Sequence, residues 1–143
     1  MVDIPDKVRL YDKDGFSLRG ACVVWDSPQK NTILLIKNKK NKWGLPGGGI
    51  EKYDNCFQEG ALRELKEEAG IIGKVTSYLG NYKDIHGKKK HNTFVWDVIP
   101  LEELEDYKEN YRERKWFSFK EAFQILNEKS IHQNIIFDSK KRI

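Results

Sequence analysis

The segment that most constrains this chain is a glycine-rich turn that leads directly into an amphipathic helix. Residues 43–71 read WGLPGGGIEKYDNCFQEGALRELKEEAGI. Asn55 is the predicted N-cap, with Gln58 three residues later as in a capping box, and Gly70 is the predicted C-terminal glycine. At about 100° per residue, one arc of the helix is apolar and is expected to face a core: Phe57, Ala61, Leu62, Leu65 and Ala69.

Three glutamates lie on the adjoining arc of the same helix. Glu64, Glu67 and Glu68 are three or four positions apart, a spacing at which like charges repel by roughly 0.2–0.5 kcal/mol. A hard divalent cation reverses that repulsion, because Mg²⁺ binds carboxylate oxygens together with substrate phosphates. Glu64 and Glu68 are therefore the predicted ligand pair, and Glu67 is free to act as a general base or to bind a second ion.

A solvated helix face is the competing interpretation of these acids. The joint pattern favours the functional one, because a glycine turn leads directly into a helix whose acids share one face and which ends at Gly70. Residues 47–49 are all glycine, which lets backbone atoms approach a metal ion or a phosphate closely. The segment is not a P-loop, because it lacks Gly-Lys-Ser/Thr. Gly60 keeps the acidic arc open one turn earlier, and Arg63 is predicted to tether the loop or one of the carboxylates through a bidentate bond.

Strand-like segments surround this helix and indicate one domain over residues 1–143. Four segments are predicted strands, namely 19–25, 32–36, 74–82 and 93–99. The first two are expected to form a hairpin across a turn at 26–31, and a polar loop at 83–91 is expected between the last two. A further helix is predicted at 119–127, with Ala122, Phe123 and Leu126 on one face, and the basic tail 139–143 is expected to be frayed. This order predicts mixed sheets sandwiched by helices.

Composition excludes several classes of protein. The 143 residues carry a net charge of +4, far from a polycationic balance, and contain no apolar run near the roughly 20 residues of a membrane span. The first residues lack a basic and an apolar signal region. Cys22 and Cys56 make neither a disulfide framework nor a zinc site, so we expect a reduced cytoplasmic protein, possible also in the nucleus.

The charge is divided unevenly along the chain. Residues 51–70 hold six of the 22 acidic and three of the 26 basic residues, so the remainder carries 16 acidic and 23 basic residues, net +7. An acidic centre in a basic body suits a substrate with many phosphates. The candidate phosphate-binding lysines flank the glycine turn or lie in the later polar segment: Lys37, Lys39, Lys40, Lys42, Lys88, Lys89 and Lys90. Solvated loop lysines are the alternative.

The run Arg63-Glu64-Leu65-Lys66-Glu67-Glu68-Ala69-Gly70-Ile71, after its glycines, resembles the signature of the Nudix hydrolases. The resemblance implies an α/β/α sandwich around a mixed sheet and hydrolysis of a nucleoside diphosphate linked to another group, with Mg²⁺ or Mn²⁺. It further implies that Glu64, Glu68 and the carbonyl of Gly47 bind metal and that Glu67 accepts the proton. The family has a Glu where this chain has Asn55, as if one residue had been added, and Asp54 or Glu51 could substitute.

Other segments are similar to the diphosphoinositol polyphosphate phosphohydrolases, which also cleave diadenosine polyphosphates. The similarity runs from about Arg9 to Lys129 and includes residues 9–22, 43–49, 89–93 and 112–117. By this resemblance, the phosphates are gripped by Arg9, Arg19, Lys89, Lys90, His91, Arg112 and Lys129. Ser17 replaces a lysine of that subfamily and Asn92 replaces a frequent arginine.

Several functions remain open at this point. Within the enzyme class, the rivals are hydrolysis of nucleoside triphosphates, of dinucleoside tetraphosphates and of messenger-RNA caps. A non-catalytic polyphosphate- or RNA-binding module is the alternative from another class, which the basic segments favour. We expect a monomer that acts on a small-molecule polyphosphate, with no membrane partner and no nucleic acid except capped RNA.

Overall fold

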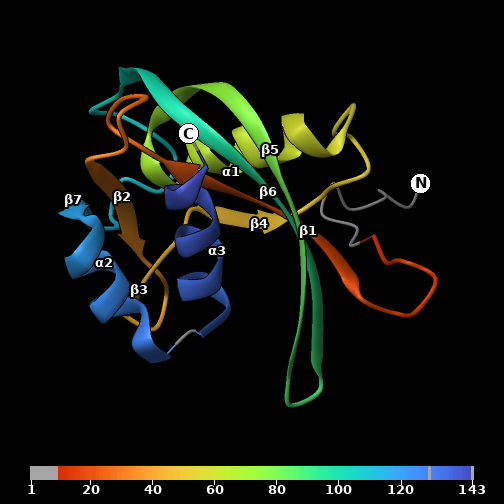
Figure 1. Ribbon diagram of the computed structural model, residues 1–143. Helices are drawn as coiled ribbons and strands as arrows, with labels where there is room; N and C mark the ends of the chain where they lie inside the picture. The colour runs from red at the N-terminus through yellow and green to blue at the C-terminus, as the bar shows by residue number, and fades with distance from the viewer. Residues whose placement is uncertain (1–9, 129, 143) are drawn as a thin grey trace.

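The computed structural model describes residues 10–128 and 130–142, and contains two β-sheets and three α-helices in those ranges (Figure 1). The first sheet has the order β4-β1-β6-β5, formed by Gly47–Gly49, Ser17–Val24, Lys89–Glu103 and Ile71–His86. The second sheet has the order β3-β2-β7, formed by Trp43–Gly44, Thr32–Lys37 and Arg114–Ser118. The helices are α1 (Phe57–Ala69), α2 (Phe119–Ile125) and α3 (Ser130–Lys141), and a short 3₁₀ helix, η1 (Leu126–Glu128), follows α2.

Strands β1 and β2 are apolar on both faces because each face packs in a different core. Ala21, Val23 and Trp25 belong to the core that α2 and α3 cover, whereas Cys22 and Val24 belong to the core against α1. Leu34 and Ile36 face α1 in the same way, while Ile33 and Leu35 face the opposite core. Alternation with a period of two therefore builds the predicted α/β/α sandwich, with α1 on one side and α2 and α3 on the other (Figure 1).

The predicted hairpin between the first two strands is wrong. Strand β1 runs parallel to β6 and antiparallel to β4, whereas β2 pairs with β3 and β7 in the other sheet. The two strands meet only at their adjoining ends, through the bridge Trp25–Ile33 and the hydrogen bond from the Asp26 amide to the Thr32 carbonyl, at 3.0 Å. The turn was predicted correctly, but the strands diverge because each has a better partner in its own sheet.

The expected polar loop at 83–91 is instead the end of a long two-stranded arm. Strands β5 and β6 are antiparallel and pair out to His86 opposite Lys89, with Gly87 at φ +63° in the turn. The arm projects from the body of the molecule (Figure 1). Most residues at the end of the arm are exposed on both faces. The sequence there therefore lacks the alternation of apolar and polar residues that marks a half-buried strand.

The C-terminal segment is more ordered than predicted. Helix α2 and η1 cover the predicted 119–127 helix, and Ala122 and Leu126 are buried, but Phe123 is 36% exposed. Helix α3 was not predicted and runs into the segment expected to be frayed. Ser139 is fully buried, where its hydroxyl contacts Asp97 and accepts a hydrogen bond from the Trp25 indole at 2.8 Å. Within the described ranges, no helix combines the length and apolar character needed to cross a membrane.

Candidate active site

Helix α1 begins and ends almost where the sequence predicts. Gly70 has φ +65°, and its amide donates to the Lys66 carbonyl at 3.0 Å, as a C-terminal glycine does. The predicted N-cap is wrong, because Cys56 rather than Asn55 holds that position and makes no side-chain cap hydrogen bond. Ala61, Leu65 and Ala69 are buried as expected, with Phe57 and Leu62 packed beside them. The adjoining acidic arc of α1 therefore lies toward the glycine strand.

The glycine strand β4 lies directly against two of the predicted metal ligands. The Gly47 amide donates to Glu68 Oε1 at 2.8 Å. A side chain at Gly48 would place its Cβ 2.6 Å from Glu64 Cδ, so only glycine admits the carboxylate in this position. Strand β4 is held there by antiparallel pairing with β1, which sets Arg19 opposite Gly49 and Ala21 opposite Gly47.

Arg63 connects the turn after the glycines to the acidic arc, as the sequence predicts. Its Nε donates to Asp54 Oδ1 at 2.8 Å and its Nη2 to Asp54 Oδ2 at 3.1 Å, and Nη2 also donates to the Gly49 carbonyl at 3.2 Å. Its Nη1 donates to Glu64 at 3.0 Å and to Glu67 at 3.2 Å. Asp54 therefore occupies the bidentate position opposite Arg63, and Gly60 admits it, since a Cβ there would lie 2.8 Å from Asp54 Oδ2.

Burial and mutual repulsion disfavour the charged forms of two acids of this site, Glu64 and Glu68. Burial and the nearby Glu64 carboxylate raise the pKa of Glu68 to about 8, against the hydrogen bond from the Gly47 amide, which lowers it. Burial also raises the pKa of Glu64, although Arg63 opposes this. Asp54 behaves differently: burial would raise its pKa, but hydrogen bonds from Arg63 and from the Glu51 amide hold that pKa below its usual value.

The donor set fits a hard divalent cation. Glu64 and Glu68 lie one helical turn apart beside the glycine strand, and their raised pKa values mean that a cation there would stabilise both charged forms. In the described part of the chain, no group of three or more His, Cys, Asp or Glu side chains is arranged so that it could hold a metal ion by itself. The chain's own cations and amides instead bind these carboxylates, with Arg63 on Glu64 and the Gly47 amide on Glu68.

The segment 104–113 between β6 and β7 brings further charges onto this acidic arc. Lys108 Nζ lies 3.4 Å from Glu67 Oε1, and Arg112 Nη2 lies 3.9 Å from Glu68 Oε2. Arg112 is also paired with Glu109, at 2.8 Å from Nη2. Sequence reasoning selected Arg112 but missed Lys108 and Glu109, because nothing in a polar run of this composition shows which residues turn toward α1.

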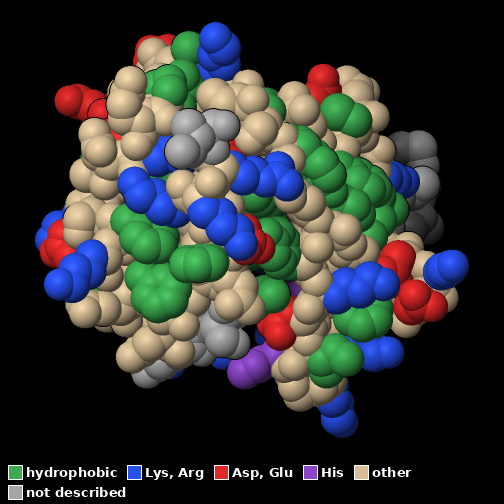
Figure 2. Space-filling view, viewed as in Figure 1, with side chains coloured by type: hydrophobic (Ala, Val, Ile, Leu, Met, Phe, Trp, Pro, Cys, Tyr) green, Lys and Arg blue, Asp and Glu red, His purple; other side chains and the backbone are tan. Residues whose placement is uncertain are grey.

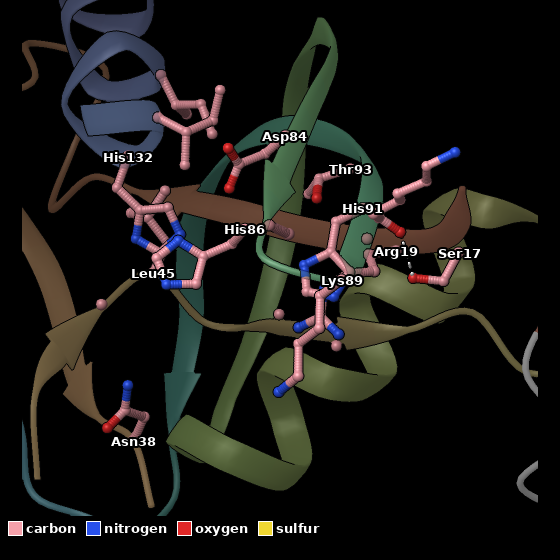
Figure 3. Close-up of a pocket in the computed structure, with 18 of the residues that line it drawn as sticks. Ser17, Arg19, Asn38, Leu45, Asp84, His86, Lys89, His91, Thr93 and His132 are labelled. Carbon is pink, nitrogen blue, oxygen red and sulfur yellow. Dashed lines mark hydrogen bonds between the residues drawn. The ribbon is translucent and has the colours of Figure 1, made fainter. Parts of the chain in front are cut away.

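A cleft of about 980 Å³ opens beside the glycine strand (Figure 3). Its lining includes Glu68, Gly47 and Gly48 together with side chains from the arm, from the segment between β2 and β3, and from α3. Eight Lys and Arg residues line it against the two acids Glu68 and Asp84: Arg19, Lys39, Lys40, Lys42, Lys88, Lys89, Lys90 and Arg112. Of the three predicted active-site acids, Glu68 lines this basic cleft, whereas Glu64 and Glu67 are not among its lining residues.

Most of the predicted phosphate ligands meet in this cleft. Arg19, Lys89, Lys90, His91 and Arg112 all line it. They converge because the parallel pairing of β1 with β6 sets Ser17 beside His91 and Arg19 beside Thr93. Arg9 and Lys129 lie outside the described residues. Lys37 is not among the lining residues and instead stacks over the Trp43 ring at 5.2 Å.

The cleft also holds His86, His132 and Tyr11, which the sequence did not single out, beside the predicted His91. All three histidines of the chain line it, with His86 and His91 on the arm and His132 on α3 (Figure 3). Histidine side chains are visible beside the projecting arm in the space-filling view (Figure 2). Tyr11 lines it too and is 59% exposed. No pattern in the sequence marks them, because His86 lies in the segment expected to be a loop, His132 lies on the unpredicted α3, and Tyr11 lies ahead of β1.

The two departures from the phosphohydrolase pattern have structural roles here. The buried Ser17 hydroxyl donates to the Lys90 carbonyl at 3.2 Å (Figure 3). Asn92 is buried, where it donates to Asp12 at 3.2 Å and accepts from Asn81 at 3.0 Å. Both side chains therefore fix the base of the arm, on which the basic residues of the cleft depend.

Solved structures of several Nudix proteins share this fold. A NUDIX hydrolase from Nitrosomonas europaea superposes with a TM-score of 0.74 at 18% identity and covers 85% of this chain and 86% of that chain. A binary complex of the C. elegans Ap4A hydrolase superposes with a TM-score of 0.69 at 15% identity and covers 85% and 93%. At these identities the likeness concerns the fold.

The sequence itself matches the NUDIX domain family over residues 17–138. Curated relatives include diphosphoinositol polyphosphate phosphohydrolase 3-beta of Bos taurus, 34% identical over 134 residues, covering 90% of this chain and 80% of that protein. Diphosphoinositol polyphosphate phosphohydrolase 2 of Mus musculus is also 34% identical over 134 residues, covering 90% and 73%. With its acidic helix, its glycine strand and these relatives, the chain belongs to the Nudix hydrolase family and is a pyrophosphohydrolase.

Proposed function

We propose that this pyrophosphohydrolase cleaves a phosphoanhydride bond in diphosphoinositol polyphosphates, in diadenosine polyphosphates, or in both. The observation that carries the proposal is the single cleft lined both by Glu68 with the glycine strand and by eight cationic side chains. Such a surface suits a substrate with more phosphates than the two that react, because the additional phosphates need their own counter-charges. The names of the curated relatives support the same substrate class.

Each part of the site has a proposed role in the reaction. Hydrolases of this family generally use a divalent metal ion. Here Glu64, Glu68 and the Gly47 carbonyl would hold Mg²⁺ or Mn²⁺. When bound, such an ion neutralises phosphate charge in the transition state. Glu67 accepts the proton of the water that attacks phosphorus, while the bridging P–O bond breaks and the leaving phosphate takes the electron pair.

The chain's own cations assist these steps. Arg63 orients the Glu67 carboxylate through its Nη1, at 3.2 Å, and the same guanidinium is fixed by Asp54. Arg19, Lys89, Lys90, His91 and Arg112 bind the phosphates that do not react. Arg9 and Lys129 stay predicted ligands.

A substrate panel tests this proposal. Purified protein is assayed with Mg²⁺ and with Mn²⁺ on diphosphoinositol polyphosphates, diadenosine pentaphosphate, capped RNA and nucleoside triphosphates. We expect phosphate-rich substrates to be hydrolysed fastest, and Glu67→Gln to lower kcat by about 10²–10⁴-fold. Glu59→Gln, an exposed position in the first turn of α1, is the matched control and should keep the wild-type rate. Full activity of Glu67→Gln, or binding without turnover of every compound, contradicts the proposal.

Dinucleoside polyphosphates are favoured by one separate observation. Tyr11 is an exposed aromatic ring in the cleft lining, where a nucleobase could stack on it. An inositol ring has no π face, so it gains nothing comparable there. Tyr11 thus distinguishes the two substrate classes within the same proposed chemistry.

The remaining proposals concern location and assembly. Cys22 and Cys56 are both free thiols, which is typical of a reducing compartment and supports a cytoplasmic location. The monomeric state stays a prediction, which gel filtration with light scattering tests directly. It also stays a prediction that capped RNA is the one nucleic acid that this protein binds.

A further inference from the structure

Glu109 holds the guanidinium of Arg112 by the edge that carries Nε and Nη2, and the same Nη2 lies 3.9 Å from Glu68 Oε2. Arg112 Nε donates to Glu109 Oε1 at 2.9 Å, and Nη2 lies 2.8 Å from the same oxygen. The Tyr111 hydroxyl donates to this oxygen as well, at 3.3 Å. On the other side of the guanidinium, Nη1 donates to the Lys37 carbonyl at 3.4 Å. The Arg112 side chain is only 10% exposed, so its direction is set by these contacts.

The backbone at Glu109 is fixed against the C-terminal end of α1. The Leu104 amide donates to the Gly70 carbonyl at 2.7 Å, and the Glu109 amide donates to the Glu67 carbonyl at 2.9 Å. These two bonds attach segment 104–113 to the C-terminal end of α1. Glu109 therefore keeps a defined position relative to the acidic arc, whatever the side chain of Arg112 does.

We propose that Glu109 is a positioning residue that holds Arg112 in the cleft lining and keeps its Nη2 from closing onto Glu68. The inference rests on the proposed function, in which Arg112 binds phosphate. Glu68 Oε2 lies 3.9 Å from Arg112 Nη2 and is the other carboxylate within reach. Without Glu109, the guanidinium would turn toward Glu68, a proposed metal ligand, and would be lost to the cleft. Nε and Nη2 share the single oxygen Oε1 of Glu109, and contact along this edge holds the planar guanidinium in one orientation.

A double-mutant cycle in phosphate binding separates this role from others. The affinity for inorganic tripolyphosphate is measured by calorimetry in a chelating, metal-free buffer, so that only the chain's own cations are probed. The variants are Glu109→Ala, Arg112→Met and the two combined. Glu113→Ala is the matched control, because Glu113 is exposed in the same segment and carries the same charge. In parallel, KM and kcat are measured on the best diphosphate substrate with Mg²⁺.

Glu109→Ala should weaken tripolyphosphate binding about tenfold and raise KM by a similar factor, with kcat within about twofold of wild type. In the Arg112→Met background, Glu109→Ala should have no further effect, because its partner is gone. Charge alone predicts the reverse, because removal of an acidic side chain should strengthen the binding of an anion. We expect that strengthening for the control Glu113→Ala. Glu109→Gln, which keeps an acceptor oxygen, should fall between Glu109→Ala and wild type.

An equal loss in both backgrounds, tighter binding by Glu109→Ala, or a fall in kcat without a change in affinity overturns the positioning role. If the wild-type chain hydrolyses no diphosphate, the proposed function fails on its own. The binding cycle still decides the role of Glu109 in that case, because it needs no turnover.

Discussion

The Asp54 carboxylate accepts two hydrogen bonds from the Arg63 guanidinium, one to each oxygen, at 2.8 and 3.1 Å. Asp54 Oδ2 also accepts the Glu51 amide at 2.8 Å, so one side chain joins the turn after the glycines to the acidic helix. The remaining donors of Arg63 reach Glu64, Glu67 and the Gly49 carbonyl. This contact orients the whole acidic arc, although the family signature has its acid one position later, at Asn55.

Removing that contact should destabilise the protein. Asp54→Ala leaves a largely buried guanidinium without its bidentate partner, and we expect the free energy of unfolding to fall by about 2 kcal/mol. Denaturation in urea measures the change, with the exposed Asp106→Ala as control. A loss equal to that of the control would show that Arg63 does not depend on Asp54.

The same carboxylate makes the stability sensitive to acid. Because the pKa of Asp54 is lowered in the folded chain, its contribution is present above the usual aspartate pKa of 3.8 and is lost as the pH falls further. The difference in stability between wild type and Asp54→Ala should therefore shrink below about pH 4. A difference that stays constant down to pH 2.5 would contradict this.

Glu68 should produce the opposite trend at higher pH. With its pKa raised from 4.5 to about 8, the folded metal-free chain keeps a proton that the unfolded chain releases, so stability falls as pH rises between these values. Glu68→Gln stays neutral, and its Tm advantage over wild type should grow from pH 5 to pH 8 in chelator. Thermal unfolding at several pH values measures it. The control Glu59→Gln should show no such growth, and an advantage independent of pH would contradict the account.

Neighbouring glycines should differ sharply in their effect on metal binding. Gly48→Ala would place a Cβ against the Glu64 carboxylate, which must then move, whereas Gly49→Ala would meet nothing within 4 Å. Because Gly48→Ala would displace the Glu64 carboxylate, this variant should weaken Mn²⁺ binding about tenfold or more. Titration followed by electron paramagnetic resonance measures free Mn²⁺. Equal affinities for the two variants would mean that Glu64 is not a ligand.

Tyr11 should matter for nucleotides alone. Tyr11→Ala should raise KM for diadenosine pentaphosphate about tenfold through the loss of base stacking, and leave KM for a diphosphoinositol polyphosphate unchanged. Tyr11→Phe keeps the ring and should behave as wild type on both. Steady-state kinetics on the two substrates decide, and an equal rise on both would assign Tyr11 to phosphate binding or to folding.

The predicted and the missed parts of the fold follow the physical signals available. Helix α1 combined an apolar stripe from Phe57 to Ala69 with the C-terminal Gly70, so its limits were nearly correct. Helix α3 was missed although Ile131 and Ile135 are four residues apart, because a short stripe next to Lys140 and Lys141 resembles a basic tail. The local sequence does not show which strands pair with one another, because both faces of β1 and β2 are apolar and would fit either sheet.

The candidate site was easier to predict near α1 than across the cleft. Glu64, Glu67 and Glu68 share one helix face, so their spacing alone brings them together. Arg19 and Lys89 line the same cleft because β1 pairs with β6, which a single sequence does not reveal without the family resemblance. Glu109 and Lys108 depend on how segment 104–113 folds against α1, and they carried no signal.

The most direct measurement is the anomalous scattering of crystals soaked in Mn²⁺. The account predicts a peak bound by the Glu64 and Glu68 carboxylates and the Gly47 carbonyl, with Arg112 turned away from Glu68 toward the cleft. Diffraction showing Mn²⁺ only elsewhere, with Glu64 still bonded to Arg63 and Glu68 still bonded to the Gly47 amide, would contradict the claim that this acidic helix face is a metal centre.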